Sequence, residues 1–503
     1  MSLAVLASRA LCGLQAIPVR VEVHMGPGLP AFHVVGLPDA GVRESRERVR
    51  AAIISSGFDF PPGRITVNLA PADLPKESGR FDLPIALGVL LASGQVQGAP
   101  DLGPRALQNH VFAGELSLTG AIVSVSAPLA IALAVARSDP GAVLVLPAGS
   151  AEHAARVPGL TVLAASSLLD VVQHFAGLGA LPLATAPPVA ASPHAEPCLS
   201  EVRGQALARR VLEVAAAGGH SLLMAGPPGT GKSMLAHRLP GLLPRLTAEQ
   251  ALEVAALAGI SGQAQTFTDL PPFRAPHHTA SAPALVGGGV YPRPGEISMA
   301  HQGVLFLDEL PEFQRRVLES LREPLETGCV SIARASRTLT FPAAFQLVAA
   351  MNPCPCGWFG HKKKSCRCTP DRIEAYRGRL SGPLLDRVDL QIVLPAADAD
   401  WIDLPEGESS GPVRARVATC RGVQQRRQQT TNARLDVAQM ESVCRLDHEG
   451  KKLLAQAIQR WDWSARVVHR VLRVSRTLAD LSGHDHIAPI HVSEAVQYRL
   501  PWR

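Results

Sequence analysis

Aromatic and charged side chains are both scarce in this sequence. Phe, Trp and Tyr make up only 4% of its 503 residues, and Asp, Glu, Lys and Arg make up 18%. Hydrophobic residues nevertheless account for 47% of the chain, which excludes the composition typical of an intrinsically disordered protein. The sequence also lacks an apolar run of the roughly 18 residues that a membrane-spanning helix requires. We therefore expect a folded protein with no membrane-spanning segment.

The N-terminus lacks the features of a secretory signal peptide. The apolar stretch at residues 1–16 is interrupted by Arg9 and leads directly into Val19, Val21 and Val23, which alternate with polar residues. Such alternation predicts a half-buried strand rather than a cleaved leader. We therefore predict a cytoplasmic protein, in which the 9 cysteines are not expected to form disulfides.

Neither sign of charge dominates. The 49 Lys and Arg residues against 43 Asp and Glu residues give a net charge of +6, which permits a nucleic acid partner but does not require one. Glycine (43) and proline (42) are abundant, so many turns and tight loops are expected. The length is too great for a single core and predicts two or three domains.

Changes in residue pattern divide the chain into four parts. Residues 1–178 alternate short apolar strands, such as Arg64–Leu69, with helical patterns, which predicts an α/β domain. Residues 179–198 are rich in Ala, Pro and Thr and indicate a linker. Residues 199–395 contain near-continuous apolar runs, as expected for the buried strands of a parallel sheet. Residues 396–503 follow helical patterns and predict a helical C-terminal domain.

The most specific motif lies near the start of the third part. It has the spacing G-x4-G-K-[S/T] and stands between an apolar run and a helical pattern. Its residues are Gly226, Pro227, Pro228, Gly229, Thr230, Gly231, Lys232 and Ser233. Glycine is needed because a side chain would collide with the phosphate that the backbone N–H groups and the following helix bind. We predict that Lys232 neutralises the β- and γ-phosphates of ATP and that the Ser233 hydroxyl binds Mg²⁺.

Two further apolar runs end in polar residues that fit this chemistry. Val304–Leu307 is followed by Asp308, which we expect to bind Mg²⁺, and by Glu309, which is placed to polarise the attacking water as a general base. Acids at a strand end are common, but the upstream phosphate loop favours the catalytic interpretation. Phe345–Met351 is followed by Asn352, which could orient the same water; the alternative is a turn residue before a proline.

Together these residues resemble the magnesium-chelatase-like AAA+ family known as YifB/ComM. The resemblance is carried by Val202–Gln205, Gly226–Ser233, Arg274–His278, Gly295–Ser298, Val304–Phe313, Asn352–Gly357, Leu380–Arg387 and Ser464–Asp480. It covers nearly the full chain. It implies a Lon-protease-like N-terminal α/β domain, an AAA+ parallel-sheet ATPase core and a helical C-terminal lid. It further implies a ring, usually a hexamer, with ATP bound between neighbouring subunits.

The resemblance also implies roles for three residues outside the phosphate loop. Arg387 resembles the arginine finger that reaches into the next subunit's site and stabilises transition-state charge. Arg466 resembles the second sensor, which touches the γ-phosphate from the C-terminal domain, and Gln205 lies in a nucleotide-binding segment. Without the family, both arginines would be assigned to surface ion pairs.

The N-terminal domain resembles the proteolytic domain of Lon-type proteases at Pro75–Leu87 and Gly114–Gly120. A Ser–Lys dyad would need a serine in the first segment and a lysine soon after the second. Ser78 falls before the expected position, and Ala121–Arg137 contains no lysine. We therefore predict an assembly or binding module rather than a protease.

Four of the cysteines are clustered in sequence. Cys354 and Cys356 are followed, after nine residues, by Cys366 and Cys368. Two closely spaced thiolate pairs suit a structural, tetrahedral Zn²⁺, with His361 as a possible substitute ligand. The alternative is a plain loop, because CxC pairs are less diagnostic than CxxC pairs.

The joint placement of basic residues around the ATPase core favours a nucleic-acid partner, which we expect to be DNA. Lys362, Lys363 and Lys364 lie between the cysteine pairs, and Val330–Phe341 predicts a β-hairpin that carries Arg334 and Arg337 near its tip. In related rings a hairpin in this place projects into the central pore. Each cluster taken singly fits a solvated surface, but together they would bind phosphates without reading base sequence.

These features leave two function classes. The first, which the resemblance to the YifB/ComM family implies, is a motor acting on single-stranded and branched DNA, a branch-migration helicase that promotes the integration of incoming strands during natural transformation. The second is a chelatase-like motor that remodels a protein partner or drives metal insertion. The Lon-like domain and the cysteine loop favour the first, because they mark the YifB/ComM branch. An ATP-dependent protease is opposed by the missing dyad.

Overall fold

The computed structural model describes residues 3–74, 76, 78–96, 107–188, 196–263, 267–289, 292–334, 337–396 and 404–499. The chain forms two compact units. Unit 1 comprises Met1–Ala191 and Ala251–Thr268, and unit 2 comprises Ser192–Gln250 and Asp269–Arg503. Within the described ranges, no helix combines the length and apolar character needed to cross a membrane.

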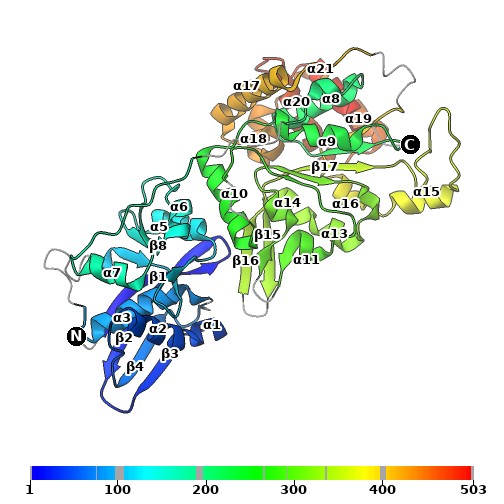
Figure 1. Cartoon of the computed structure of the whole chain (residues 1–503). Helices are drawn as coiled ribbons and strands as arrows, with labels where there is room; N and C mark the ends of the chain where they lie inside the picture. Colours follow the sequence, from blue (N-terminus) through cyan, green and yellow to red (C-terminus); the bar gives the residue numbers. More distant parts are fainter. Residues whose placement is uncertain are drawn as a thin grey trace. The chain divides into compact units, whose positions relative to one another are not determined.

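Unit 1, blue to cyan in Figure 1 apart from its returning segment, is built on a seven-stranded sheet of order β3-β4-β2-β1-β5-β8-β9. The strands are β1 (Leu3–Cys12), β2 (Gln15–Gly26), β3 (Ala31–Val35), β4 (Arg64–Ala70), β5 (His110–Phe112), β8 (Val143–Pro147) and β9 (Thr161–Ala165). β2 pairs antiparallel with β1 and β4, and the other pairs are parallel. Val19, Val21 and Val23 are buried on one face of β2, as their alternation predicts.

The helices of unit 1 pack around this sheet. They are α1 (Ala40–Arg43), α2 (Ser45–Ser55), α3 (Asp82–Ala92), α5 (Pro128–Ser138), α6 (Ala148–Ala154) and α7 (Leu168–Phe175), with a short β6 (Glu115–Leu116) and β7 (Ile122–Val123) hairpin. α3 is buried almost along its whole length and contacts β1 and β2. Gly88 permits this approach, since a Cβ there would lie 2.6 Å from Val23 Cγ2. From Ala251 onward, α10 (Ala248–Ser261) also contributes to the core of unit 1.

Unit 2 contains the parallel sheet that the apolar runs predict. Its order is β11-β14-β17-β10-β18, and every neighbouring pair is parallel. The strands are β11 (Phe273–Arg274), β14 (Val304–Leu307), β17 (Gln346–Met351), β10 (Leu222–Ala225) and β18 (Leu390–Val393). All residues of β10, β14 and β17 are buried, because both faces of the sheet are covered.

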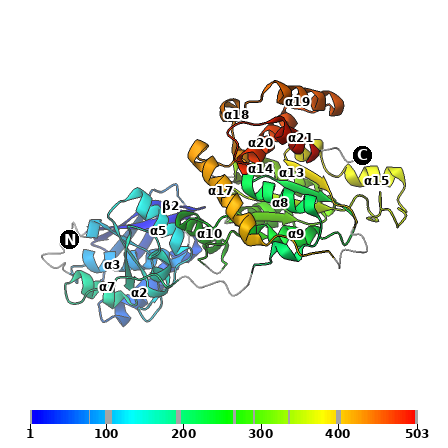
Figure 2. The ribbon, with the colours of Figure 1, turned by 90° about the horizontal axis from the view of Figure 1, so that it is seen from above.

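Helices cover the sheet and form the C-terminal region. Those around the core are α8 (Ala206–Gly218), α9 (Lys232–Arg238), α11 (Ala282–Val286), α12 (Glu296–Met299), α13 (Arg315–Ser320), α14 (Arg322–Thr327), α15 (Pro370–Arg377) and α16 (Gly382–Leu385). The C-terminal helices are α17 (Ser410–Gln428), α18 (Val437–Val443), α19 (His448–Trp461), α20 (Ala465–Leu481) and α21 (Pro489–Gln497). α8 contacts both α17 and α20 (Figure 2), so the helical region shares one hydrophobic core with the sheet. The predicted α/β class, with a parallel-sheet core and a helical C-terminus, is confirmed.

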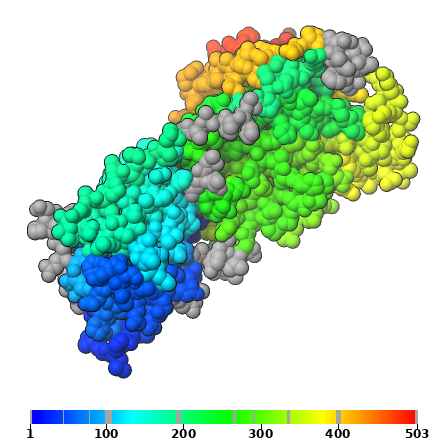
Figure 3. Space-filling model, viewed as in Figure 1, coloured from blue at the N-terminus to red at the C-terminus, as the bar shows by residue number. Residues whose placement is uncertain are grey.

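Two hairpins and a long loop extend from the core of unit 2. β12 (Gly287–Gly288) pairs with β13 (Arg293–Pro294), and β15 (Cys329–Arg334) pairs with β16 (Arg337–Pro342). The second hairpin is the one that the sequence predicts. The loop between β17 and α15 contains the clustered cysteines and lies within the yellow surface region of Figure 3.

Candidate functional site

The phosphate loop connects β10 to α9, as its motif predicts. Gly229 and Gly231 have φ values of 78° and 81°, a left-handed conformation that glycine adopts without steric cost. Gly226 is equally constrained by space, since a Cβ there would lie 2.8 Å from the Leu394 carbonyl oxygen. The loop therefore turns tightly and leads directly into α9, the arrangement in which backbone N–H groups and a helix N-terminus bind phosphate.

Lys232 lies folded over this loop. Its Nζ donates to the carbonyl oxygens of Gly226 (2.7 Å) and Pro227 (2.9 Å) and lies 3.2 Å from Asn352 Oδ1. Burial lowers the pKa of Lys232, while the nearby Asp308 carboxylate opposes this effect. An anion in the loop would compensate the buried ammonium far better than neutral carbonyls do.

The residues predicted to bind Mg²⁺ lie together. Ser233 Oγ donates to Asp308 Oδ2 over 2.6 Å, although the two residues come from different elements, α9 and the end of β14. The other carboxylate oxygen of Asp308 accepts the Glu309 N–H at 2.9 Å. A hydroxyl and a carboxylate oxygen at this edge of the sheet are the hard ligands that Mg²⁺ prefers.

Glu309 has an unusual backbone and a partner that the sequence did not reveal. Its φ is 51°, and its side chain is 52% exposed. Its Oε2 lies 3.1 Å from Nδ1 of His278, whose ring centre is 4.1 Å from that of His277 at an interplanar angle of 33°. Only the repeated histidines of the Arg274–His278 motif could have signalled this contact. The pair holds the carboxylate beside Asp308 in an orientation that solvent can reach.

Gln205 reaches the loop from the segment before α8. Its Nε2 donates to the Thr230 carbonyl at 2.8 Å, and its own backbone is left-handed, with a φ of 49°. Its Oε1 is buried and has no hydrogen-bond partner among the described residues. A buried hydrogen-bond acceptor thus lies beside the loop, a buried ammonium lies within it, and a hydroxyl–carboxylate pair lies at its end. Groups of these kinds can together bind a nucleotide, its phosphates and its Mg²⁺. These residues therefore fit the nucleotide and its metal.

Arg387 and Arg466 are at a different place in unit 2 from the phosphate loop. Both line a pocket of about 560 Å³, which also contains Glu326, Asp389 and Arg470 and no residue of the phosphate loop. Arg387 is 6% exposed, its Nη2 lies 2.7 Å from Glu326 Oε1, and its Nη1 donates to the Pro383 carbonyl at 2.7 Å.

The sheet separates this pocket from the phosphate loop. Arg387 precedes the N-terminal end of β18, whereas the loop follows the C-terminal end of β10. The two strands are parallel neighbours, with Leu222 opposite Leu390 and Ala225 opposite Val393. The arginines and the phosphate loop consequently lie at opposite edges of the same sheet.

The four clustered cysteines converge in space. Cys354 Sγ lies 3.4 Å from Cys356 Sγ and 3.7 Å from Cys366 Sγ, and Cys356 Sγ lies 3.5 Å from Cys366 Sγ. With Cys368, all four sulfur atoms lie within 4.8 Å of one another. This arrangement fits a single tetrahedral ion such as Zn²⁺. His361 instead accepts the backbone N–H groups of Lys363 and Lys364 at 3.0 Å.

The basic residues predicted to contact DNA differ in their surroundings. Lys362, Lys363 and Lys364 are exposed, and the Lys364 ammonium lies 4.0 Å from the centre of the Trp358 ring. Lys362 and Lys363 also line a cavity of about 270 Å³ that includes Gly226 and Pro227 of the phosphate loop. Arg334 and Arg337 pair at the end of the β15–β16 hairpin, but their side chains lie outside the described residues.

In unit 1, Ser78 contacts an arginine. Arg80 Nε donates to Ser78 Oγ at 3.0 Å, and its Nη2 donates to Ser126 Oγ at 2.9 Å. An arginine remains protonated in proteins and cannot serve as the general base of a serine nucleophile.

Comparisons with known proteins cover nearly the whole chain. Residues 198–401 match the family described as magnesium chelatase, subunit ChlI; residues 21–150 match subunit ChlI of Mg-chelatase, and residues 407–499 match the ChlI C-terminal family. The chain is 46% identical to the competence protein ComM of Haemophilus influenzae, over 99% of this chain and 98% of that protein. It is 45% identical to the uncharacterized protein YifB of Escherichia coli, over 99% of this chain and 97% of that protein. It is 41% identical to the uncharacterized protein Rv2897c of Mycobacterium tuberculosis, over 98% of this chain and 97% of that protein.

Proposed function

The chain belongs to the magnesium-chelatase-like AAA+ family that includes ComM and YifB, and from this premise we propose that it is a ring-forming ATPase that acts on branched DNA. The family itself indicates ATPase activity. The observation that supports ring formation is the separation of Arg387 and Arg466 from the phosphate loop across the sheet. Two arginines that cannot serve their own subunit's nucleotide are suited to the nucleotide of a neighbouring subunit.

Hydrolysis in this proposal relies on residues from two subunits. Lys232 would exchange its carbonyl partners for phosphate oxygens, and Ser233 and Asp308 would hold Mg²⁺, which neutralises charge on the phosphates. Glu309 would accept a proton from the attacking water, with its carboxylate oriented by His278. Asn352 would hold that water beside the γ-phosphate.

Arg387 and Arg466 complete the site from the adjacent subunit. Arg387 would exchange Glu326 for the γ-phosphate, so that the charge developing in the transition state meets a guanidinium. Arg466 would contact the same nucleotide as Arg387. Its sensor role would therefore concern the γ-phosphate bound by the neighbouring subunit and not the one bound by its own subunit. A closed ring, which we propose to be a hexamer, would supply such a neighbour to every subunit.

DNA as the substrate is supported by the related protein and by the basic residues. The Haemophilus influenzae relative is named a competence protein, and competence is the uptake of DNA. Lys362, Lys363 and Lys364 are exposed, and Arg334 and Arg337 end a hairpin. We assign these residues to contacts with the phosphates of single-stranded and branched DNA, and branch migration during recombination to the motor.

The first test measures the ATPase rate with and without single-stranded and forked DNA. Strong stimulation that is lost in Lys232→Ala and in Glu309→Gln supports a DNA motor and leads to a branch-migration assay. A rate that no DNA changes would contradict the proposal and favour a chelatase-like motor that remodels a protein or drives metal insertion. The matching family is described as magnesium chelatase, subunit ChlI. A protease is disfavoured by the Ser78–Arg80 contact.

We also assign a structural Zn²⁺ to the four cysteines. The measurement is the metal content of the purified protein, with about one zinc per chain expected. Cys366→Ser removes one ligand and should release the metal, whereas Cys444→Ser changes a buried cysteine outside the cluster and should retain it. Wild-type protein without zinc after purification in zinc-containing medium would refute the assignment.

A further inference from the structure

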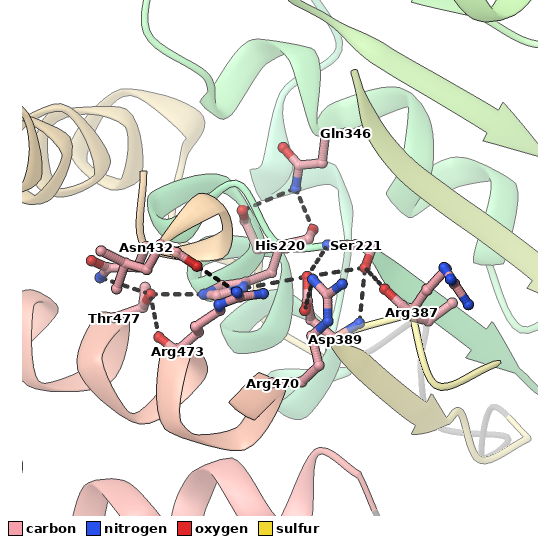
Figure 4. Close-up of polar contacts among 12 residues, drawn as sticks. His220, Ser221, Gln346, Arg387, Asp389, Asn432, Arg470, Arg473 and Thr477 are labelled. Carbon is pink, nitrogen blue, oxygen red and sulfur yellow. Dashed lines mark hydrogen bonds and ion pairs between the residues drawn. The ribbon is translucent and has the colours of Figure 1, made fainter. Parts of the chain in front are cut away.

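A buried carboxylate lies between the arginine pocket and the strand that leads to the phosphate loop. Asp389 is 3% exposed, and its Oδ2 accepts the Ser221 backbone N–H at 2.9 Å. Its Oδ1 accepts Arg470 Nη1 at 3.1 Å, and His220 Nδ1 lies 3.5 Å from Oδ2. Figure 4 shows these side chains converging on Asp389.

The surroundings of Asp389 keep it ionised. Burial alone would raise the pKa of the carboxyl, but Arg470, His220 and the Ser221 N–H together hold that pKa well below its usual range. A buried carboxylate with this many donors is held in one place, because leaving any of them unpaired costs free energy. Asp389 is therefore a rigid anchor point.

The same contacts fix the segment that carries Arg387. The Asp389 N–H donates to Ser221 Oγ at 2.8 Å, and that hydroxyl lies 3.0 Å from Asp389 Oδ2 and 3.2 Å from the Arg387 carbonyl oxygen, either of which can accept its proton. Ser221 directly precedes β10, and Asp389 directly precedes β18. The segment that carries Arg387 is thus bound to the start of β10, and the other end of β10 leads into the phosphate loop.

Asp389 also holds the helix that carries Arg466. Arg470 lies four residues after Arg466 in α20, so the two side chains project from the same face of the helix, one turn apart. His220 Nε2 lies 2.7 Å from Thr477 Oγ1, which adds a second link between α20 and the segment before β10. One carboxylate consequently connects the elements that present both arginines.

We propose that Asp389 is a positioning residue that sets Arg387 and Arg466 in the geometry needed for a neighbouring subunit's ATP. The inference rests on the proposed sharing of sites between subunits. It predicts that a change at Asp389 impairs the adjacent subunit's nucleotide site while leaving nucleotide binding in its own subunit intact. A carboxylate that served only to stabilise its own fold would have no such effect in trans.

The test uses Asp389→Asn, which preserves the size of the side chain and removes its charge. Because a misplacement of about 1 Å can cost on the order of 10²-fold in rate, we expect kcat to fall by about 10- to 100-fold, with KM for ATP within about twofold of wild type. Thermal unfolding and the mass of the assembly with a non-hydrolysable ATP analogue are measured alongside. Unchanged kcat in a folded, assembled variant overturns the proposal.

Mixed rings separate a defect in trans from a defect in cis. Asp389→Asn subunits are mixed in equal amounts with Lys232→Ala subunits, whose own site is disabled but whose arginines are intact. Random assembly pairs an intact phosphate loop with intact arginines at about a quarter of the interfaces, so activity should rise above that of both parents. Activity equal to the parental average would show that Asp389→Asn damages its own subunit's site, and would overturn the proposal.

Arg387→Ala mixed with Lys232→Ala is the reference. If this mixture gains no activity, sites are not shared, and both the proposed function and the inference fail. If it gains activity and the Asp389→Asn mixture does not, only the inference fails. If Asp389→Asn does not fold, Arg470→Gln takes its place, because it removes the charged partner and keeps the hydrogen bonds between Asp389 and Ser221. Mixed with Lys232→Ala, Arg470→Gln must give the same gain of activity. The absence of that gain would overturn the inference.

Discussion

Replacing Gly357 with alanine is expected to displace the phosphate loop without changing any residue proposed to contact ATP. Gly357 lies in the cysteine loop with a φ of 80°, and a Cβ there would lie 2.7 Å from Cδ and 2.8 Å from Cγ of Pro228. Gly360 in the same loop has a φ of 74°, but a Cβ there would meet no atom within 4 Å. The two glycines share the backbone conformation and differ in the collision, so Gly360→Ala is a matched control.

The magnitude follows from these distances. Alanine in a left-handed conformation costs about 1 kcal/mol relative to glycine, and both variants bear that cost. Only Gly357→Ala must also restore a normal carbon–carbon separation of about 3.5–4.0 Å, which moves Pro228 by about 1 Å. A shift of about 1 Å in a positioning loop can lower the rate on the order of 10²-fold. We therefore expect kcat/KM for ATP to fall by about 10- to 100-fold in Gly357→Ala and by less than about threefold in Gly360→Ala.

The assay is steady-state ATP hydrolysis together with titration of a fluorescent ATP analogue, on both variants at the same assembly state. Zinc content is measured in each, so that loss of metal is not mistaken for displacement of the loop. Equal losses in the two variants would show that backbone strain rather than the contact with Pro228 controls the site. Wild-type kinetics in Gly357→Ala would show that the loop accommodates the methyl group elsewhere.

Three other outcomes are expected. His278→Ala should lower kcat by about tenfold with little change in KM, because Glu309 loses the group that orients it. His277, whose Nδ1 contacts Thr279, is the control, and His277→Ala should leave kcat unchanged. Similar kinetics in both variants would show that His278 does not contribute to the site. Asp480→Ala should lower the free energy of unfolding, measured by urea titration, by about 3–5 kcal/mol, since Arg427 and the buried Arg476 lose the carboxylate that they share. A decrease below about 1 kcal/mol would contradict this prediction. Stripping zinc with a chelator should lower the midpoint of thermal unfolding in wild type but not in Cys366→Ser, which is expected to lack the metal already.

The parts of the site that depend on local sequence could be predicted. The phosphate loop and the Asp308–Glu309 pair each occupy a few consecutive residues at a strand end, and the parallel sheet brings those ends to one edge. The cysteine cluster is local too, since its four members lie within one loop. The strand pattern was equally informative, because fully buried strands leave near-continuous apolar runs.

The remaining features depend on contacts between distant segments. The His278–Glu309 contact joins two loops, and nothing in either loop specifies the other. The shared pocket of Arg387 and Arg466 arises only when α20 packs beside the start of β18. The sequence likewise does not show that Ala251–Thr268 packs with unit 1, since a helical pattern does not identify its partner.

Because the arginine pocket and the phosphate loop lie at opposite edges of the sheet, each protomer of the proposed ring would have one surface that donates arginines and a different surface that receives them. Association through such surfaces is head-to-tail, so an open string of protomers always ends in one nucleotide site that lacks its arginines. In the proposed arrangement, only a closed ring would give every nucleotide site its arginines. Turnover per protomer should therefore rise with protein concentration until rings close. A ligand that threads a closed ring would have to insert one of its own ends or enter through an opened interface. Opening an interface would temporarily inactivate the nucleotide site at that interface.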